Sequence, residues 1–253
     1  MTKLSVNVNK VALLRNARTI GIPDVARAAR ICVEAGAHGI TVHPRPDARH
    51  IRGRDVDEIA EMLKDHPGVE FNIEGNPFPE FIEIARRVRP AQCTLVPDDP
   101  GAFTSDHGWD LREHGERLKP IVAELKSHGA RVSLFMGPDP EQIARAADVG
   151  ADRVELYTEP YAAAFGREGG GEVFESFARA AAHAQALGLG VNAGHDLNLD
   201  NLGKFCTIPG ILEVSIGHAL ISDALEFGLA DAVRKYLDVL AAAGAAGAGE
   251  SNE

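Results

Sequence analysis

Short β-rich runs alternate with longer amphipathic segments along almost the whole chain, and this alternation constrains the fold more than any other feature of the sequence. Eight runs are predicted to be strands: Leu4–Asn9, Gly39–His43, Glu70–Glu74, Gln92–Val96, Arg131–Met136, Arg153–Tyr157, Gly190–Ala193 and Leu212–Ile216. Several of them are nearly continuous apolar runs, as is typical of strands that are covered on both faces. The pattern therefore predicts a repeated β/α unit.

The segments between these runs have helical periodicity. The predicted helices are Asp24–Ala35, Asp55–Lys64, Phe78–Val88, Leu111–Ser127, Pro140–Val149, Glu172–Leu187, Leu199–Phe205, Ala219–Phe227 and Leu229–Ala243. Gly36, Gly129 and Gly150 each stand where a helix is expected to end, followed by a short link into the next strand. Eight such units predict an α/β fold, a (β/α)₈ TIM barrel with extra helices, and a doubly wound open sheet is the alternative.

The length of 253 residues fits one barrel domain over residues 1–243, with residues 244–253 expected to be a disordered C-terminal tail. Two connections, Pro97–Asp110 and Thr158–Gly171, are longer than a minimal barrel needs, and loops of this length are often binding loops. A plain surface excursion is the other interpretation of each.

Composition excludes several classes of partner. The net charge of −11 argues against a nucleic-acid or anionic-membrane partner, because both select clustered Lys and Arg, whereas small phosphorylated ligands need only a few local cations. Cys32, Cys93 and Cys206 form no CxxC motif, so neither a zinc ribbon nor a disulfide framework is predicted. Neither a signal-peptide pattern nor an apolar stretch of about 18 residues is present, which predicts a cytoplasmic protein.

Polar residues gather where the predicted strands end, which is the end at which a (β/α)₈ barrel carries its active site. His43, Glu74 and His195 each close a strand. Imidazoles exchange protons near neutrality, and partial desolvation raises the pKa of a carboxyl group such as that of Glu74. Further polar residues are expected at the same rim: Asn7, Asn9, Arg45, Thr104 and Glu155. Any one of these residues can instead be a hydrogen-bonded rim residue, but three proton carriers at strand ends favour acid–base catalysis.

The segment Ile216-Gly217-His218-Ala219 closes the eighth strand and opens a helix. Loops after the seventh and eighth strands of such barrels often bind phosphate at a helix N-terminus, and Gly217 permits close approach of the backbone. Tight packing is the other reason for a glycine at this position. The histidines His43, His50, His195 and His218 have no HxH or HExxH spacing, so no metal site is predicted.

At these residues the sequence resembles the pyridoxine 5′-phosphate synthase family of vitamin B6 biosynthesis, from Leu4 to about Leu240. The most specific matching segments are Val6-Asn7-Val8-Asn9-Lys10 with Leu14-Arg15-Asn16-Ala17-Arg18, Gly39-Ile40-Thr41-Val42-His43-Pro44-Arg45 with Arg49-His50-Ile51, Val132-Ser133-Leu134-Phe135, Val191-Asn192-Ala193-Gly194-His195, and Ile216-Gly217-His218-Ala219. The resemblance implies a cofactor-free barrel enzyme, often assembled into octamers. It implies condensation of 1-deoxy-D-xylulose 5-phosphate with 3-amino-2-oxopropyl phosphate to pyridoxine 5′-phosphate, phosphate and water.

The resemblance also implies roles for individual residues. It makes His43 and Glu74 general bases, His195 a proton donor and Glu155 a stabiliser of a transition state. Contacts to the aminoketone phosphate or its product are implied for Asn7, Arg18, Gly217 and His218. Contacts to the deoxyxylulose phosphate are implied for Arg45, His50 and Thr104.

The chain departs from the family pattern at two places that bear on substrate binding. Many members carry Asp-His where this chain has Asn9-Lys10, a pair that touches the deoxyxylulose phosphate, and many carry Gly where it has Asp196. A backbone N–H contact at Asp196 survives the change, provided that the carboxylate points away from a phosphate. The alternatives are another phosphosugar-acting barrel enzyme, either an isomerase or a Schiff-base aldolase using Lys10, and a non-catalytic homologue that binds phosphometabolites.

Overall fold

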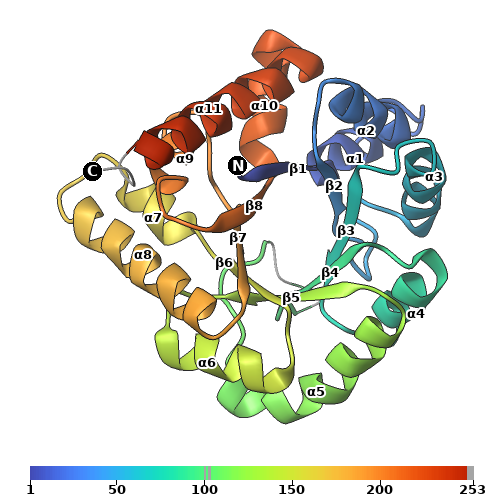
Figure 1. Ribbon diagram of the computed structural model, residues 1–253. Coiled ribbons are helices and arrows are strands. Elements are labelled where there is room, and N and C mark those ends of the chain that lie inside the picture. Colours follow the sequence, from blue (N-terminus) through green and yellow to red (C-terminus); the bar gives the residue numbers. More distant parts are fainter. Residues whose placement is uncertain (100, 102–103, 250–253) are drawn as a thin grey trace.

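Eight parallel strands form a closed barrel in the computed structural model, which describes residues 1–99, 101 and 104–249. The strands are β1 Lys3–Asn7, β2 Gly39–Val42, β3 Glu70–Gly75, β4 Gln92–Leu95, β5 Arg131–Met136, β6 Arg153–Leu156, β7 Gly190–Ala193 and β8 Ile211–Ile216. Figure 1 looks into the barrel and shows the helices arranged around it. The pairing of β1 with β8 closes the sheet, so the predicted (β/α)₈ barrel is confirmed and the open-sheet alternative is wrong.

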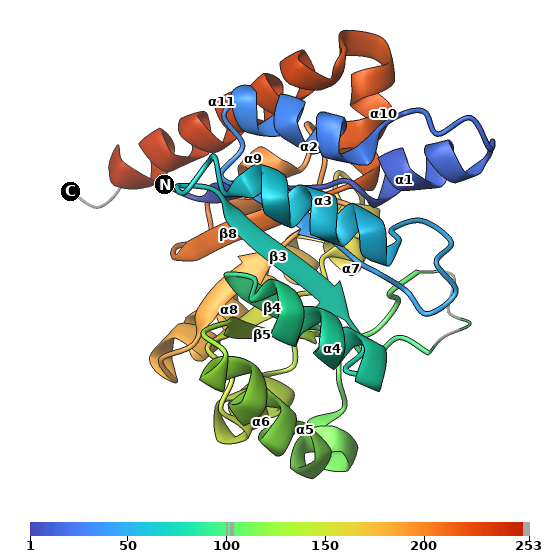
Figure 2. The ribbon, with the colours of Figure 1, turned by 90° about the vertical axis from the view of Figure 1, so that its right-hand side faces the viewer.

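Helices follow the strands and cover the outside of the barrel. They are α1 Asn9–Asn16, α2 Val25–Glu34, α3 Gly53–Leu63, α4 Pro79–Val88, α5 Leu111–Ser127, α6 Pro140–Val149, α7 Glu159–Ala164, α8 Gly170–Ala186, α9 Leu202–Phe205, α10 His218–Phe227 and α11 Leu229–Gly249. Figure 2 shows β3 pointing toward the side of the molecule where the loops after β2 and β4 gather. This side is the carboxyl end of the strands, where a barrel of this type carries its site.

The helices differ from the prediction at several boundaries, and α1 and α7 were not predicted at all. Asn9, predicted to end the first strand, begins α1, because the side chain of Asn7 accepts a hydrogen bond from the backbone N–H of Asn9 and turns the chain there. The short helix α7 lies inside the predicted loop Thr158–Gly171. Helix α11 continues to Gly249 rather than ending at Ala243, since the alanine-rich sequence favours helix. Residues 250–253 lie outside the described part of the chain.

The strands are buried on both faces, as expected for the several that read as nearly continuous apolar runs, but the interior of the barrel is polar, which was not predicted. Gln92 on β4 hydrogen-bonds across the barrel to Glu213 on β8 at 3.3 Å and to Asn192 on β7 at 3.4 Å. The Thr41 hydroxyl lies 2.7 Å from that of Ser5 and accepts a hydrogen bond from the Asn72 amide at 3.3 Å. Such partners offset the cost of burying polar groups.

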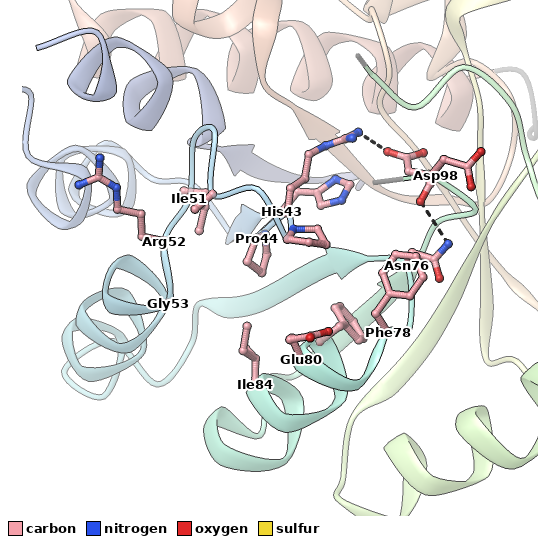
Figure 3. A pocket seen from close by; sticks show the side chains of 15 residues that line it. His43, Pro44, Ile51, Arg52, Gly53, Asn76, Phe78, Glu80, Ile84 and Asp98 are labelled. Carbon is pink, nitrogen blue, oxygen red and sulfur yellow. Dashed lines mark hydrogen bonds and ion pairs between the residues drawn. The ribbon is translucent and has the colours of Figure 1, made fainter. Parts of the chain in front are cut away.

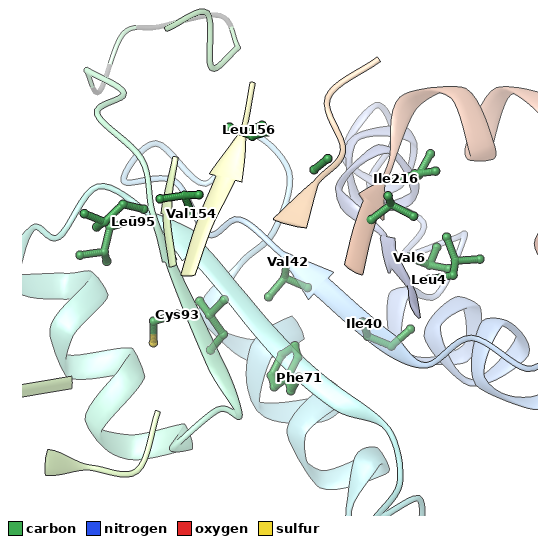
Figure 4. Packing of buried hydrophobic residues seen from close by; sticks show 14 of the residues in the cluster. Leu4, Val6, Ile40, Val42, Phe71, Cys93, Leu95, Val154, Leu156 and Ile216 are labelled. Atoms are coloured by element: carbon green, nitrogen blue, oxygen red, sulfur yellow. The ribbon is translucent and has the colours of Figure 1, made fainter. Parts of the chain in front are cut away.

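The apolar residues of the same strands therefore face outward, since successive side chains of a strand alternate between its faces. These residues form one buried cluster with the inner faces of the helices, part of which Figure 4 shows: Leu4, Val6, Ile40, Val42, Phe71, Cys93, Leu95, Val154, Leu156 and Ile216. The hydrophobic core is thus a ring between sheet and helices, and it leaves a polar floor beneath the mouth of the barrel. Within the described residues, no helix is long and apolar enough to cross a membrane.

Candidate active site

A cavity of about 430 Å³ opens at the carboxyl ends of the strands. The predicted site residues that line it are Asn7, Asn9, Lys10, His43, Arg45, His50, Glu74, Thr104, Glu155, His195, Asp196, Gly217 and His218. Arg18 does not line this cavity; it lies exposed in the turn that follows α1. The structure therefore brings together residues from seven of the strands and the loops after them, which are far apart in the sequence.

Glu74, near the end of β3, is buried in the cavity wall. Asn7 donates a hydrogen bond to its Oε2 at 3.3 Å, and Ser215 donates to its Oε1 at 3.5 Å. The pKa of Glu74 is raised to about 8. Burial is the largest cause, and the negative charges of Asp98 and Glu213 also contribute. A carboxyl group with this pKa exchanges its proton close to neutral pH, as a general base or acid must.

A second buried carboxyl group, that of Glu155 on β6, lies in the same cavity. Its Oε2 has no hydrogen-bond partner among the described residues. Burial raises the pKa of Glu155 well above its ordinary value, and the charge of Glu74 adds to this effect. Because two negative charges in one buried site disfavour each other, ionisation of Glu74 and ionisation of Glu155 oppose one another.

His43 stands directly after β2 and faces Glu74. Its Nδ1 lies 4.0 Å from Glu74 Oε2, and its backbone N–H donates to the side chain of Asn9 at 2.9 Å. Burial lowers the pKa of His43 well below its usual value, and the charges of Arg45, His50 and Arg49 lower it further. His43 is therefore a neutral imidazole near pH 7, which is the form that accepts a proton.

His195 stands after β7 and is only partly buried. Its Nε2 lies 3.2 Å from the hydroxyl of Thr104, and its backbone carbonyl accepts a hydrogen bond from Thr158 at 2.6 Å. The Tyr157 ring packs edge-on against the imidazole, with 5.1 Å between the ring centroids. The loop after β4 thus reaches the residue that ends β7, across the mouth of the barrel.

Asp196 adopts a left-handed backbone conformation with φ of 62°, which glycine adopts most easily. Its Oδ2 lies 3.3 Å from His195 Nδ1, and this contact lowers the pKa of the Asp196 carboxyl. The carboxylate of Asp196 is therefore directed at the imidazole of His195. His43 and His195 thus meet opposite electrostatic surroundings.

The side of the cavity near α10 and the loop after β2 is suited to anions. Gly217 is the N-cap of α10, whose first backbone N–H groups have no partner within the helix. A Cβ atom at Gly217 would lie 3.1 Å from the side chain of Asn7, so a larger residue would crowd this corner. Lys10, Arg45 and Arg49 bring cationic side chains to the same cavity.

Sequence reasoning assigned no role to several residues of the cavity. Arg49 lines it, and so do Ser105, Phe135 and Ser215. Arg49 stands between two predicted ligands, Arg45 and His50, and that position was the available signal. Ser215 lies on the inward face of β8, one residue before Ile216 of the predicted phosphate segment. The sequence could have indicated its position only if the polar residues of β8 had been recognised as facing the inside of the barrel. Within the described residues no group of three or more His, Cys, Asp or Glu side chains is arranged to hold a metal ion.

Comparison with known proteins places this barrel in a family. A family model described as "Pyridoxal phosphate biosynthesis protein PdxJ" matches residues 4–242. A protein from Albidiferax ferrireducens named pyridoxine 5′-phosphate synthase is 55% identical over 246 residues, which cover 95% of this chain and 98% of that protein. A protein of the same name from Xanthomonas axonopodis pv. citri is 54% identical over 247 residues, covering 94% and 96%.

Solved structures support the fold at much lower identity. Thiamine phosphate pyrophosphorylase from Pyrococcus furiosus superposes with a TM-score of 0.62 at 13% identity, covering 95% of this chain and 96% of that one. Phosphoribosyl anthranilate isomerase from Thermotoga maritima gives 0.60 at 16%, covering 95% and 98%. The barrel is thus shared widely, whereas the sequence match is specific, and the chain belongs to the PdxJ family of pyridoxal phosphate biosynthesis proteins.

Proposed function

We propose that the chain is a pyridoxine 5′-phosphate synthase that condenses 1-deoxy-D-xylulose 5-phosphate with 3-amino-2-oxopropyl phosphate and releases phosphate and water. The observation that carries this proposal is the convergence of Glu74, His43 and His195 in one cavity beside an anion-binding corner. Joining an amine to a ketone, expelling water and phosphate, and closing an aromatic ring requires repeated proton transfers but no net redox step. The names of the relatives give the same product, pyridoxine 5′-phosphate.

The surroundings of the proton carriers support a division of labour. Neutral His43 and the carboxyl group of Glu74 face each other and act as bases on one side of the cavity. His195 lies on the other side of the cavity, with the carboxylate of Asp196 beside its Nδ1, and acts as the proton donor. Glu155, facing the same cavity from β6, stabilises a transition state through hydrogen bonding by its buried carboxyl group.

Two groups of residues receive the two phosphorylated substrates. Arg45, His50 and Thr104, with Asn9 and Lys10, bind the deoxyxylulose phosphate on the side of β1, β2 and the loop after β4. Asn7, Gly217 and His218 bind the aminoketone phosphate at the N-terminus of α10, and the backbone N–H of Asp196 adds a donor there. The carboxylate of Asp196 is turned toward His195, 3.3 Å from its Nδ1, and its charge also acts on His218 and Lys10.

Incubation of the protein with both substrates tests the proposal. We expect pyridoxine 5′-phosphate and inorganic phosphate to appear in equal amounts. A phosphosugar isomerase would convert one substrate alone, and a Schiff-base aldolase would be trapped by borohydride at Lys10, which lies half-buried at the start of α1. Binding of both substrates without release of phosphate would instead make the chain a non-catalytic binding protein.

Replacing Gly217 by valine is expected to weaken binding of the aminoketone phosphate. The new side chain would crowd Asn7 and obstruct the backbone N–H groups at the start of α10. Loss of a hydrogen bond to a charged group raises the apparent KM by about tenfold or more. Steady-state kinetics in each substrate checks this, and a variant that binds both substrates as tightly as the parent would place the phosphate elsewhere.

We also propose that the chain forms a homo-oligomer through the surface around α1 and α10, which contact each other. Apolar side chains are exposed there, with Leu14 57%, Ile20 65%, Ile22 62% and Leu225 80% accessible. Arg18 lies in the same exposed segment, outside the cavity of its own chain. We therefore propose that the contact with substrate implied for Arg18 by the family resemblance is made only in the oligomer. Light scattering of the parent protein is expected to give a mass above that of one chain, and Leu225→Asp is expected to lower that mass. A parent protein with the mass of one chain would refute the proposal.

A further inference from the structure

A second, smaller cavity of about 220 Å³ lies behind the loop after β2, between that loop, α4 and the end of β4. Figure 3 shows it, with Asp98 and Asn76 at one edge and Ile84 of α4 at another. His43 and Arg45 line both cavities, so together they form part of the wall between them. Asp98 lines only the smaller cavity, and therefore stands behind Arg45 as seen from the substrate cavity.

Asp98 joins three of the loops at the mouth of the barrel. Its Oδ2 pairs with Nη2 of Arg45 from the loop after β2 and accepts a hydrogen bond from Ser105 Oγ at 2.7 Å in the loop after β4. Its backbone carbonyl accepts from Asn76 Nδ2, after β3, at 3.2 Å. The side chains of Asp98 and Arg45 are only 4% and 5% exposed, so this pair is shielded from water and salt.

We propose that Asp98 is a positioning residue that orients the guanidinium of Arg45 toward the deoxyxylulose phosphate and ties the loop carrying Thr104 and Ser105 to that arginine. This inference rests on the proposed function. A guanidinium has five donors in a fixed plane, so a carboxylate bound to one edge fixes the direction of the others. Groups behind a ligand-binding side chain commonly set its orientation in this way.

The charge of Asp98 has a second consequence at Glu74. The charged and titratable groups that face Glu74 come from four neighbouring elements: His43 and Arg45 after β2, Asp98 after β4, Glu155 on β6 and Glu213 on β8. Among these charges Asp98 makes the largest contribution to raising the pKa of Glu74. Removing that negative charge must therefore lower the pKa of the base, independently of any effect on Arg45.

The test compares Asp98→Asn with Asp98→Glu, which keeps the charge, and with Asp99→Asn, a matched change at the exposed neighbour. In Asp98→Asn we expect KM for 1-deoxy-D-xylulose 5-phosphate to rise about tenfold, with kcat changed less than about threefold and KM for the aminoketone phosphate unchanged. The acidic limb of the profile of kcat/KM against pH should move to lower pH. Asp98→Glu should restore much of the loss, and Asp99→Asn should behave as the parent.

A double-mutant comparison ties the effect to Arg45. In an Arg45→Met background, adding Asp98→Asn should change KM for the deoxyxylulose phosphate less than about threefold, because the arginine to be oriented is gone. Equal increases in both KM values with a lowered Tm and an unmoved pH profile would make Asp98 merely structural and overturn the inference. Tighter binding in Asp98→Asn would show that Asp98 competes with the phosphate, which also overturns it.

Binding measurements separate this inference from the proposed function. Isothermal titration of each variant with 1-deoxy-D-xylulose 5-phosphate reports affinity without turnover. Absence of turnover in the parent protein would refute the proposed function, whereas weaker binding by Asp98→Asn alone would still support the role of Asp98. An affinity that is the same in parent and Asp98→Asn would overturn the inference whether or not the parent turns over.

Discussion

Turnover is expected to fall by about 10²–10⁴-fold when Glu74 is replaced by glutamine, because the variant keeps the size of the side chain but loses the group that accepts a proton. The hydrogen bond from Asn7 can still be accepted by the amide oxygen, so the cavity should keep its shape. Phosphate release with both substrates measures the effect. Glu70→Gln, at the opposite end of the same strand, is the matched control and should stay within a few-fold of the parent.

The direction in which Glu74→Gln changes the stability of the protein follows from the raised pKa of Glu74. Glu74 has a pKa of about 8 in the folded protein and an ordinary value near 4.5 when unfolded, so between these values the folded state binds more protons. The free energy of unfolding therefore falls as pH rises through this window. Glutamine does not ionise, so the variant does not lose stability in this way as the pH rises. Glu74→Gln should therefore have a Tm at pH 8 equal to or above that of the parent. Near-normal turnover in a folded variant would remove Glu74 from the mechanism.

His43→Asn and His195→Asn are each expected to lose orders of magnitude in kcat, and to stop the reaction at different stages. His43 is buried beside Glu74 with a lowered pKa, so its loss should block an early proton abstraction. His195 lies across the mouth with Asp196 beside it, so its loss should block a step that needs a proton delivered to a leaving group. Rapid quench followed by mass spectrometry can identify what accumulates in each variant.

The control for both imidazole variants is His128→Asn. His128 lies at the end of α5, where its Nε2 is 3.9 Å from Glu124, and a loose surface pair of this kind contributes little. Activity close to the parent is expected there. If the two cavity variants accumulated the same species in the same amount, the separate duties assigned to the imidazoles would be wrong.

The strand order and most boundaries were predictable because local signals agree with the fold. Gly36, Gly129 and Gly150 were expected to end helices, and each has a positive φ in the structure, of 108°, 91° and 89°. The polar interior of the barrel was not predicted, because several strands were interpreted as nearly continuous apolar runs. Its inward side chains alternate with apolar ones, and only hydrogen bonds such as that from Gln92 to Glu213 show that the polar set faces inward.

Some residues of the candidate site could likewise be predicted from the sequence, and others could not. Residues that end strands, such as Glu74 and His195, could be assigned to the cavity because the barrel brings those ends together. Asp98 could not be assigned from the sequence, since its partner Arg45 is 53 positions away and the loop between β4 and α5 has no periodic pattern. Arg18 resembles the family's substrate ligands in sequence, but its exposed position outside the cavity is a property of the folded chain.

The measurement that tests the central claim most directly is turnover of the parent protein after exhaustive chelation. Glu74, His43 and His195 are proposed to carry every proton transfer, with none assigned to a metal-bound water. Chelated protein in metal-free buffer is therefore expected to form pyridoxine 5′-phosphate from both substrates at the untreated rate, with one phosphate released per product. Turnover that disappears on chelation and returns with zinc would contradict the account and make the histidines metal ligands.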